Sequence, residues 1–424
     1  MSVMNLPETI ATGEAVLLQD AIKTLENHGF VATIDRERPT LGRTRADALV
    51  RIGYGKGGDV LYAAEIKRWL TPANLGPAVV QLRDLGTAAL LITEYATPQV
   101  AEKLKELDIQ FVDAAGNAYL RGDNFLVWLN GRRPQTTRRP PRAGRAWQPT
   151  GLKLIFALLC NPEWIALGYR ELAAQAGVAN GTVGWVMREL VEQGFVVQAR
   201  RRTIPRRLHN RRKLLDRWVE LYTGTFRQAM LLKRCRADNP DWWKNLDATR
   251  HDALLGGEPA AALLTDYLKP GAVTVYVNPA HLTLILDYKL REAPEGEVEI
   301  RQRFWPFEYK WEHPNLVPPV LIYADLLATG DARCIETAQR IYDGHLARLI
   351  AEDLTATAER SGRADRYGCR SNAISAGWRD GTGSVARLRP WNSQQTGDDG
   401  CGSGVPGGKL EGVRSAAPET AGKG

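Results

Sequence analysis

The sequence predicts a multidomain chain of the α/β and α+β classes: an α/β domain, a central winged helix-turn-helix, a small C-terminal α/β domain and a disordered tail. Helical and strand patterns alternate up to about residue 130. A helix-turn-helix pattern spans Tyr169–Phe195 and is followed by a short strand and an arginine run. Beyond residue 355 the chain is rich in Gly, Ser, Arg and Ala. The predicted boundaries are 1–130, a basic linker at 131–149, 150–217, 218–354 and the tail at 355–424.

Composition restricts the class of protein. The formal net charge is +8 over 424 residues, and a basic balance favours a phosphate-bearing partner. The 44% hydrophobic content is enough for buried cores. No apolar run is long enough for a membrane span, and the first residues do not resemble a secretory signal, so we expect a cytoplasmic protein without membrane contact. Five cysteines without a CxxC pair argue against a zinc ribbon or a disulfide framework.

The first domain is predicted to begin with an amphipathic helix, Glu14–His28, followed by strands and two further helices. Two strand-like runs, Ala48–Ile52 and Val60–Ile66, flank a Gly-rich connection that suits a hairpin. The remaining predicted elements are the helices Pro72–Leu85 and Pro98–Leu107 and the strands Ala88–Thr93, Gln110–Val112, Ala118–Leu120 and Phe125–Leu129.

Asp47 precedes one strand of this hairpin, and Glu65 and Lys67 end the other. The two carboxylates are expected to meet at one edge, where they could bind Mg²⁺ while the lysine stabilises charge on an attacked phosphate. The order helix, strand with Asp, strand with Glu-x-Lys, helix, strand resembles the PD-(D/E)xK nuclease core, which has the restriction-endonuclease-like fold. The resemblance implies catalytic roles for Asp47, Glu65 and Lys67, and metal binding by the two acids. The alternative is that Glu65 and Lys67 are a solvated pair on one strand face.

The predicted linker, residues 131–149, carries six arginines, several prolines and no acid. Such a segment cannot build a core, so we expect it to be extended or disordered. It is either an arm that follows DNA phosphates, which would make binding sensitive to salt, or a solubilising spacer.

The central domain begins with a predicted helix, Gly151–Asn161. In the helix-turn-helix, Gly177 is expected to end the first helix and Asn180 to cap the second. The inner face of the second helix carries Val183, Val186, Met187 and Leu190. The side chains away from this face are expected to contact DNA bases or phosphates; they are Asn180, Thr182, Trp185 and Arg188. The alternative is an ordinary helical hairpin within a larger helical domain.

The wing is predicted from the run that follows, Phe195–Thr203, an apolar strand leading into arginines. Nine basic residues lie between Arg200 and Arg217, a density that favours phosphate contact over a merely solvated helix face. The wing residues expected to contact DNA are Arg200, Arg201, Arg202, Arg206 and Arg207.

The C-terminal domain is predicted to mix helices and strands, without a nucleotide-binding loop or metal-ligand spacing. Its predicted helices are Leu214–Leu232, Pro259–Leu268 and Arg333–Leu354, and its predicted strands are Ala272–Val277, Leu282–Leu286 and Val298–Arg303.

Two C-terminal segments, Leu255–Val277 and Pro318–Asp343, resemble the AbiEi-type antitoxin and transcriptional-regulator family of type IV toxin–antitoxin systems. The resemblance, which extends over about residues 10–354, implies a cytoplasmic DNA-binding repressor. It also implies neutralisation of a nucleotidyltransferase toxin without a stable complex. In the best-known members the winged helix comes first, whereas here an additional α/β domain precedes it.

Two functions therefore remain. The preferred one is a transcriptional regulator and antitoxin that binds double-stranded DNA, acts on its toxin indirectly and needs no cofactor. The alternative is an enzyme, a Mg²⁺-dependent endonuclease whose winged helix delivers the DNA. Glu65 and Lys67 discriminate between them, because cleavage needs both side chains and repression needs neither.

Overall fold

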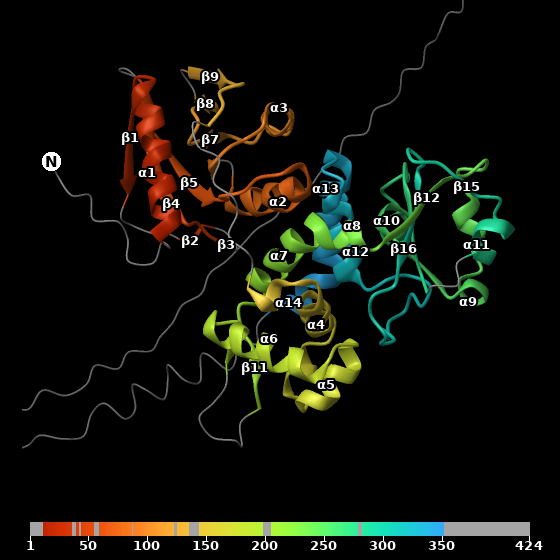
Figure 1. Ribbon diagram of the computed structural model, residues 1–424. Coiled ribbons are helices and arrows are strands. Elements are labelled where there is room, and N and C mark those ends of the chain that lie inside the picture. The colour runs from red at the N-terminus through yellow and green to blue at the C-terminus, as the bar shows by residue number, and fades with distance from the viewer. Residues whose placement is uncertain are drawn as a thin grey trace, which may run out of the picture. The chain divides into compact units, whose positions relative to one another are not determined.

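The computed structural model of the chain describes residues 12–35, 40–41, 44–54, 59–86, 88–122, 125–134, 144–197, 205–278 and 282–351 (Figure 1). All of them belong to one compact unit, residues 1–358. The predicted disordered tail and the wing residues Arg200, Arg201 and Arg202 lie outside the described residues. In the part of the chain that is described, no helix combines the length and apolarity needed to cross a bilayer.

The N-terminal part is built on a seven-stranded sheet with the order β1-β4-β5-β6-β7-β8-β9. These strands are β1 (Phe30–Asp35), β4 (Ala48–Tyr54), β5 (Val60–Ile66), β6 (Ala89–Thr93), β7 (Phe111–Asp113), β8 (Ala118–Gly122) and β9 (Phe125–Leu129); a separate small hairpin joins β2 (Thr40–Leu41) and β3 (Thr44–Arg45). The pairs are antiparallel except β5 with β6 and β6 with β7, which are parallel. The predicted hairpin of β4 and β5 is confirmed, with Ala48 opposite Ala64. Strand β1 was not predicted.

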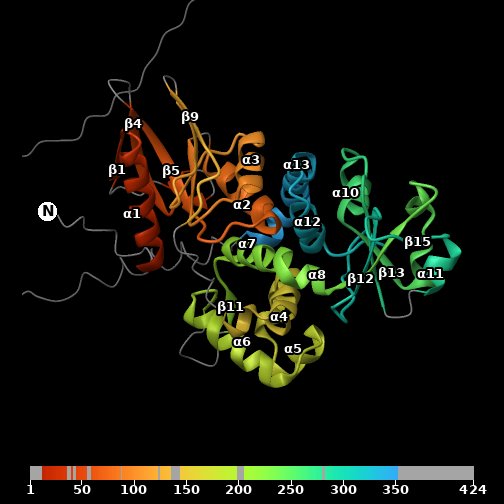
Figure 2. The ribbon, with the colours of Figure 1, turned by 45° about the horizontal axis from the view of Figure 1, so that its top comes forward.

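Helices cover both faces of this sheet (Figure 2). Helix α1 (Thr12–Asn27) buries Leu18 and Leu25 against one face, in a core shared with Ile52 and Tyr62. Helix α2 (Leu75–Leu85), which follows the 3₁₀ turn η1 (Pro72–Asn74), and helix α3 (Pro98–Glu106) pack on the other face. The chain order α1, β1, β4, β5, α2, β6 therefore places Asp47 at the start of one central strand and Glu65 near the end of its neighbour.

The central part contains two helices joined by a tight turn and a two-stranded hairpin. Its elements are η2 (Arg145–Trp147), α4 (Pro149–Cys160), η3 (Pro162–Ala166), α5 (Tyr169–Ala176), α6 (Asn180–Glu192), β10 (Val196–Val197) and β11 (Arg207–Leu208). Gly177 ends α5 in the left-handed conformation, with φ 64°, as predicted. The capping prediction for Asn180 is wrong: Ala179 occupies the N-cap with extended backbone, Asn180 is the first helical residue, and no side-chain cap bond forms.

The C-terminal part begins with α7 (Arg211–Leu221), the π-helical segment η4 (Tyr222–Phe226) and α8 (Arg227–Ala229). The predicted helix Leu214–Leu232 thus ends too late. Its last residues enter strand β12 because the Met230 carbonyl accepts a sheet hydrogen bond from the Gln302 amide at 2.7 Å.

The predicted strand Leu282–Leu286 is also wrong, since it is helical. A strand would place Leu284 and Leu286 on one face, but Leu284 is buried and Leu286 is 74% exposed.

A five-stranded sheet with the order β13-β14-β16-β12-β15 forms the centre of this part. Only β14 and β16 are parallel among these strands. The strands are β12 (Leu231–Arg236), β13 (Ala253–Gly256), β14 (Val273–Val277), β15 (Arg291–Glu292) and β16 (Val298–Gln302). The helical elements after α8 are η5 (Trp242–Asn245), α9 (Ala248–His251), α10 (Gly257–Thr265), α11 (Leu282–Asp287), α12 (Pro319–Ala328), α13 (Ala332–Ile341), η6 (Tyr342–Leu346) and α14 (Ala347–Ile350).

A buried network of charged and phenolic side chains joins η4, α8, β14 and α12. The Asp325 carboxylate accepts hydrogen bonds from the hydroxyls of Tyr222 at 2.9 Å and Tyr276 at 2.8 Å, and from Arg227 Nε at 2.9 Å. Arg227 also pairs with Glu299 at 2.8 Å. Because each buried charge here has a partner, the network fixes how these elements meet rather than offering an open charge to a ligand.

The N-terminal sheet and the C-terminal helices share one continuous hydrophobic core. Helix α2 packs on α12 so closely that a Cβ atom at Gly76 would lie 2.1 Å from the Leu327 carbonyl oxygen. Only glycine allows this approach of the two backbones. The domains predicted from composition are therefore packed together through α2, α7 and α12.

Candidate functional site

The first candidate is the solvent face of α6. Val183, Val186, Met187 and Leu190 are buried, as the predicted inner stripe requires. Residues predicted to contact DNA lie away from this stripe; Asn180, Trp185 and Arg188 are exposed and Thr182 is half-buried. The helix therefore presents an amide, an indole and a guanidinium to solvent, which are side chains able to contact base edges or phosphates.

Trp185 lies beside two arginines. The Arg145 guanidinium lies 4.5 Å and the Arg188 guanidinium 5.1 Å from the centroid of its ring, which is 49% exposed. Both distances are within the range of a cation–π contact. An aromatic ring therefore orients two cations at the surface. We call Asn180, Thr182, Trp185, Arg188 and Arg145 the α6 surface.

Arg145 was not among the predicted contact residues, because it was assigned to the linker. That assignment does not hold for the end of the linker: η2 packs on α6, and Ala146 and Trp147 are buried. The Ala146 amide donates to Glu189 Oε2 at 2.8 Å, and Trp147 Nε1 donates to Gln193 Oε1 at 3.1 Å. Trp147, an indole in a segment otherwise poor in apolar residues, is the signal that could have revealed this docking.

The segment predicted as the wing is a short hairpin in the described residues, with Val196 opposite Leu208. Arg207 is exposed on it. Arg206 is held within the protein, since it donates to the Leu167 carbonyl and its guanidinium lies 4.8 Å from the Tyr169 ring centroid. Direct DNA contact by these arginines stays a prediction.

The second candidate is a cavity that Asp47, Glu65 and Lys67 line together. Asp47 Oδ2 accepts a hydrogen bond from the Ile66 amide at 3.0 Å, which ties the start of β4 to the end of β5. Lys67 Nζ lies 3.2 Å from Glu65 Oε1 and 3.9 Å from Glu220 Oε2 of α7. The three predicted residues line a cavity of about 610 Å³, which we call the carboxylate cavity. Sequence reasoning missed its second wall on α7, which includes Lys213, Asp216, Arg217 and Glu220.

Burial and neighbouring acids set the charge state of the carboxylate cavity. Burial raises the pKa of Glu65 to about 7; Lys67 opposes this rise and Asp47 adds to it. Burial alone would lower the pKa of Lys67, but Glu65 and Glu220 outweigh burial and hold that pKa above its ordinary value. The lysine is therefore a cation held between two acids.

Magnesium chemistry fits this cavity only in part. Asp47 and Glu65 each use one oxygen in the contacts above, which leaves a second oxygen for a cation that also retains waters. However, within the described residues no group of three or more His, Cys, Asp or Glu side chains is arranged to hold a metal ion. Two buried polar atoms of cavity-lining residues, Gln81 Oε1 and Trp69 Nε1, have no hydrogen-bond partner in the described part of the chain.

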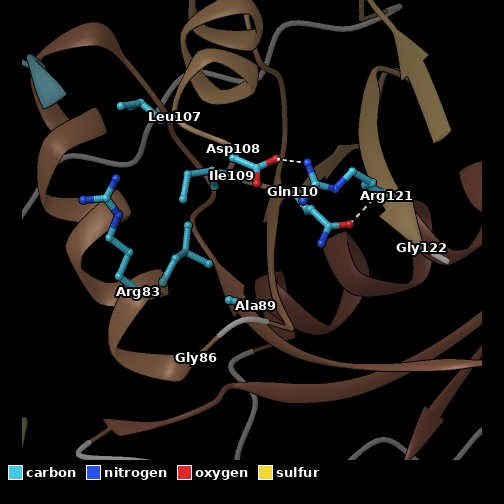
Figure 3. A pocket seen from close by; sticks show the side chains of 10 residues that line it. Arg83, Gly86, Ala89, Leu107, Asp108, Ile109, Gln110, Arg121 and Gly122 are labelled. Carbon is cyan, nitrogen blue, oxygen red and sulfur yellow. Dashed lines mark hydrogen bonds and ion pairs between the residues drawn. The ribbon is translucent and has the colours of Figure 1, made fainter. Parts of the chain in front are cut away.

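A further cavity of about 610 Å³ lies on the N-terminal part between the ends of α2 and α3 and strand β8 (Figure 3). Arg121 pairs with Asp108 at 3.4 Å, and its amide donates to Gln110 Oε1 at 2.7 Å. Several of its polar groups therefore bond to one another, and we assign it no chemistry.

Comparison with known proteins gives one match. Residues 207–347 match the model of a family described as "Transcriptional regulator, AbiEi antitoxin, Type IV TA system". No curated protein and no solved structure matches the chain. The match supports the resemblance drawn from the C-terminal segments, and it covers β11, α7 and the five-stranded sheet. The α6 surface and the residues Asp47, Glu65 and Lys67 precede the matched range.

Proposed function

We propose that this protein is a DNA-binding transcriptional regulator, acting as the antitoxin of a type IV toxin–antitoxin pair and repressing its own promoter. Double-stranded DNA is the direct partner in this proposal. The toxin, a nucleotidyltransferase, is opposed indirectly and without a stable complex. DNA would be read by the α6 surface, with the wing on the phosphate backbone.

The observation that carries the proposal is the family match over residues 207–347, which begin at the second strand of the hairpin after the helix-turn-helix. The α6 surface adds a physical reason. A helix after a tight turn, with Asn180, Trp185 and Arg188 exposed, has the side chains that major-groove recognition uses. The net charge of +8 supports attraction to phosphates.

DNA binding is tested by selecting a duplex from a randomised library with the purified full chain and measuring its affinity by fluorescence anisotropy. We expect the selected duplex to bind about 10³-fold or more tightly than random duplex, the lower end for specific regulators. Equal affinity for both duplexes would contradict a regulator.

Antitoxin activity needs a separate test. The gene for a neighbouring nucleotidyltransferase is expressed alone or together with this chain, and growth is measured. We expect rescue by the full chain and no co-purification of the two proteins. A stable complex would argue against the type IV mode, and failure of rescue would leave regulation without antitoxin activity.

The second candidate function is a Mg²⁺-dependent endonuclease of PD-(D/E)xK type. The specific observation favouring it is the convergence of Asp47, Glu65 and Lys67 at one edge of the sheet, on elements in the order expected for that core. Mg²⁺ would be held by Asp47 and Glu65, and Lys67 would face the attacked phosphate. A fold can outlast its chemistry, so the arrangement supports the fold more strongly than cleavage.

A further inference from the structure

A cluster of arginines surrounds a cavity of about 480 Å³ between η3, β11, the start of α7 and α14. Four guanidinium side chains line it, together with a single carboxylate, that of Glu163. The four are Arg206, Arg207, Arg211 and Arg348. This excess of positive charge in a concave site favours an anion.

Two of the four arginines are fixed in position by backbone groups. Arg206 donates to the Leu167 carbonyl, and Arg211 Nη1 donates to the carbonyls of Leu349 at 3.2 Å and Ala351 at 3.3 Å. These contacts do not neutralise charge, because carbonyl oxygens carry none. They hold the guanidiniums in place before a ligand arrives, which lowers the entropy cost of binding.

One donor in this cluster lacks an acceptor. Arg211 Nε is buried and has no hydrogen-bond partner among the residues described. Because this atom has almost no accessible surface, an anion oxygen would accept from it only if the side chain moved.

The start of α7 adds to the same preference. Arg211 is the first residue of this 11-residue helix, and Asn210 before it has φ 52° and forms no side-chain cap bond. The first amides of a helix point outward and carry partial positive charge, which favours anions. The first residue of α7 and four guanidinium side chains therefore lie at one cavity.

We propose that this cavity, the arginine pocket, binds a phosphate group. The phosphate could come from the backbone of DNA lying along the wing or from a soluble polyphosphate. Only the first source rests on the proposed DNA binding.

The pocket is tested first with inorganic pyrophosphate, by isothermal titration of the full chain. The test variant is Arg207→Ala with Arg348→Ala, two exposed residues whose loss should leave the fold intact. The matched control is Lys269→Ala with Lys310→Ala, which removes the same charge from exposed positions that do not line the pocket. We expect pyrophosphate affinity to fall at least about tenfold in the test variant and less than about twofold in the control. Thermal melting of both variants checks folding.

The second arm measures duplex DNA affinity against salt. If the phosphate belongs to DNA, the test variant loses roughly one or two units of the salt slope and pyrophosphate competes with duplex. If it belongs to a soluble ligand, only pyrophosphate binding falls. The proposal is overturned if the test variant matches the control in both arms. A wild type that binds pyrophosphate but no duplex would contradict the proposed function and leave the pocket standing.

Discussion

Lys67 of the carboxylate cavity and the two arginines of the α6 surface are cations with different partners. In the cavity, Lys67 lies between the carboxylates of Glu65 and Glu220. On α6, Arg145 and Arg188 lie against the indole of Trp185. An acid partner cancels the charge that a phosphate would seek, whereas an aromatic ring orients a cation and leaves its charge in place. The comparison favours α6 as the surface that meets DNA.

The largest effect is expected from removing both cations of the α6 surface. Arg145→Ala with Arg188→Ala should weaken binding to the selected duplex by about 2–6 kcal/mol, since each well-placed arginine–base contact contributes roughly 1–3 kcal/mol. Fluorescence anisotropy measures the loss. The control is Arg83→Ala with Arg121→Ala, two exposed arginines of the N-terminal part. An equal loss of affinity in the control would show that the loss reflects the change in net charge and not contacts made by α6.

Arg188 by itself tests whether α6 reads bases. Arg188→Ala should cost about 1–3 kcal/mol on the selected duplex and less on random duplex. The same anisotropy titration, carried out with both duplexes, measures the difference. Equal losses on the two would make Arg188 a phosphate contact instead.

A smaller effect is expected from the indole that orients the two arginines. Trp185→Ala should weaken duplex binding by about 0.5–2 kcal/mol, the range from exposed to desolvated cation–π contacts, and Trp185→Phe should retain part of the affinity. Titration of both variants beside the wild type measures this. Full affinity in Trp185→Ala would show that the ring does not organise the surface.

Both regions could be located from the sequence, but each lacked residues that only the structure shows. Asp47, Glu65 and Lys67 were predictable because β4 and β5 are neighbours in sequence and pair as a hairpin. In such a hairpin the start of the first strand lies beside the end of the second. Glu220 and Asp216 were not, because they lie on α7 and reach the cavity through packing between distant segments. Arg145 was missed for the same reason, since proline and arginine content suggested a linker although Trp147 docks on α6.

The prediction of secondary structure failed where the local preference of a segment and its packing disagree. Leu282–Leu286 has the β-branched and apolar composition of a strand but folds as a helix with Leu284 inside. Strand β1, at one edge of the seven-stranded sheet, was not predicted at all.

The carboxylate cavity should contribute little to DNA affinity. Glu65→Ala with Lys67→Ala is expected to leave binding of the selected duplex unchanged, because neither side chain belongs to the α6 surface. In a plasmid assay with Mg²⁺ or Mn²⁺ we expect no nicking by the wild type. Nicking by the wild type that disappears in the double variant would show that the protein is an endonuclease and contradict the proposed regulator.

The most direct test of the central claim is the salt dependence of duplex binding by the wild type, Arg145→Ala/Arg188→Ala and Glu65→Ala/Lys67→Ala. For the wild type, affinity should fall steeply between about 50 and 200 mM salt, with a slope of about −0.9 per phosphate contact. The slope and affinity should decrease in the α6 variant and stay unchanged in the cavity variant. The reverse pattern, with binding lost only in the cavity variant, would contradict recognition of DNA through α6.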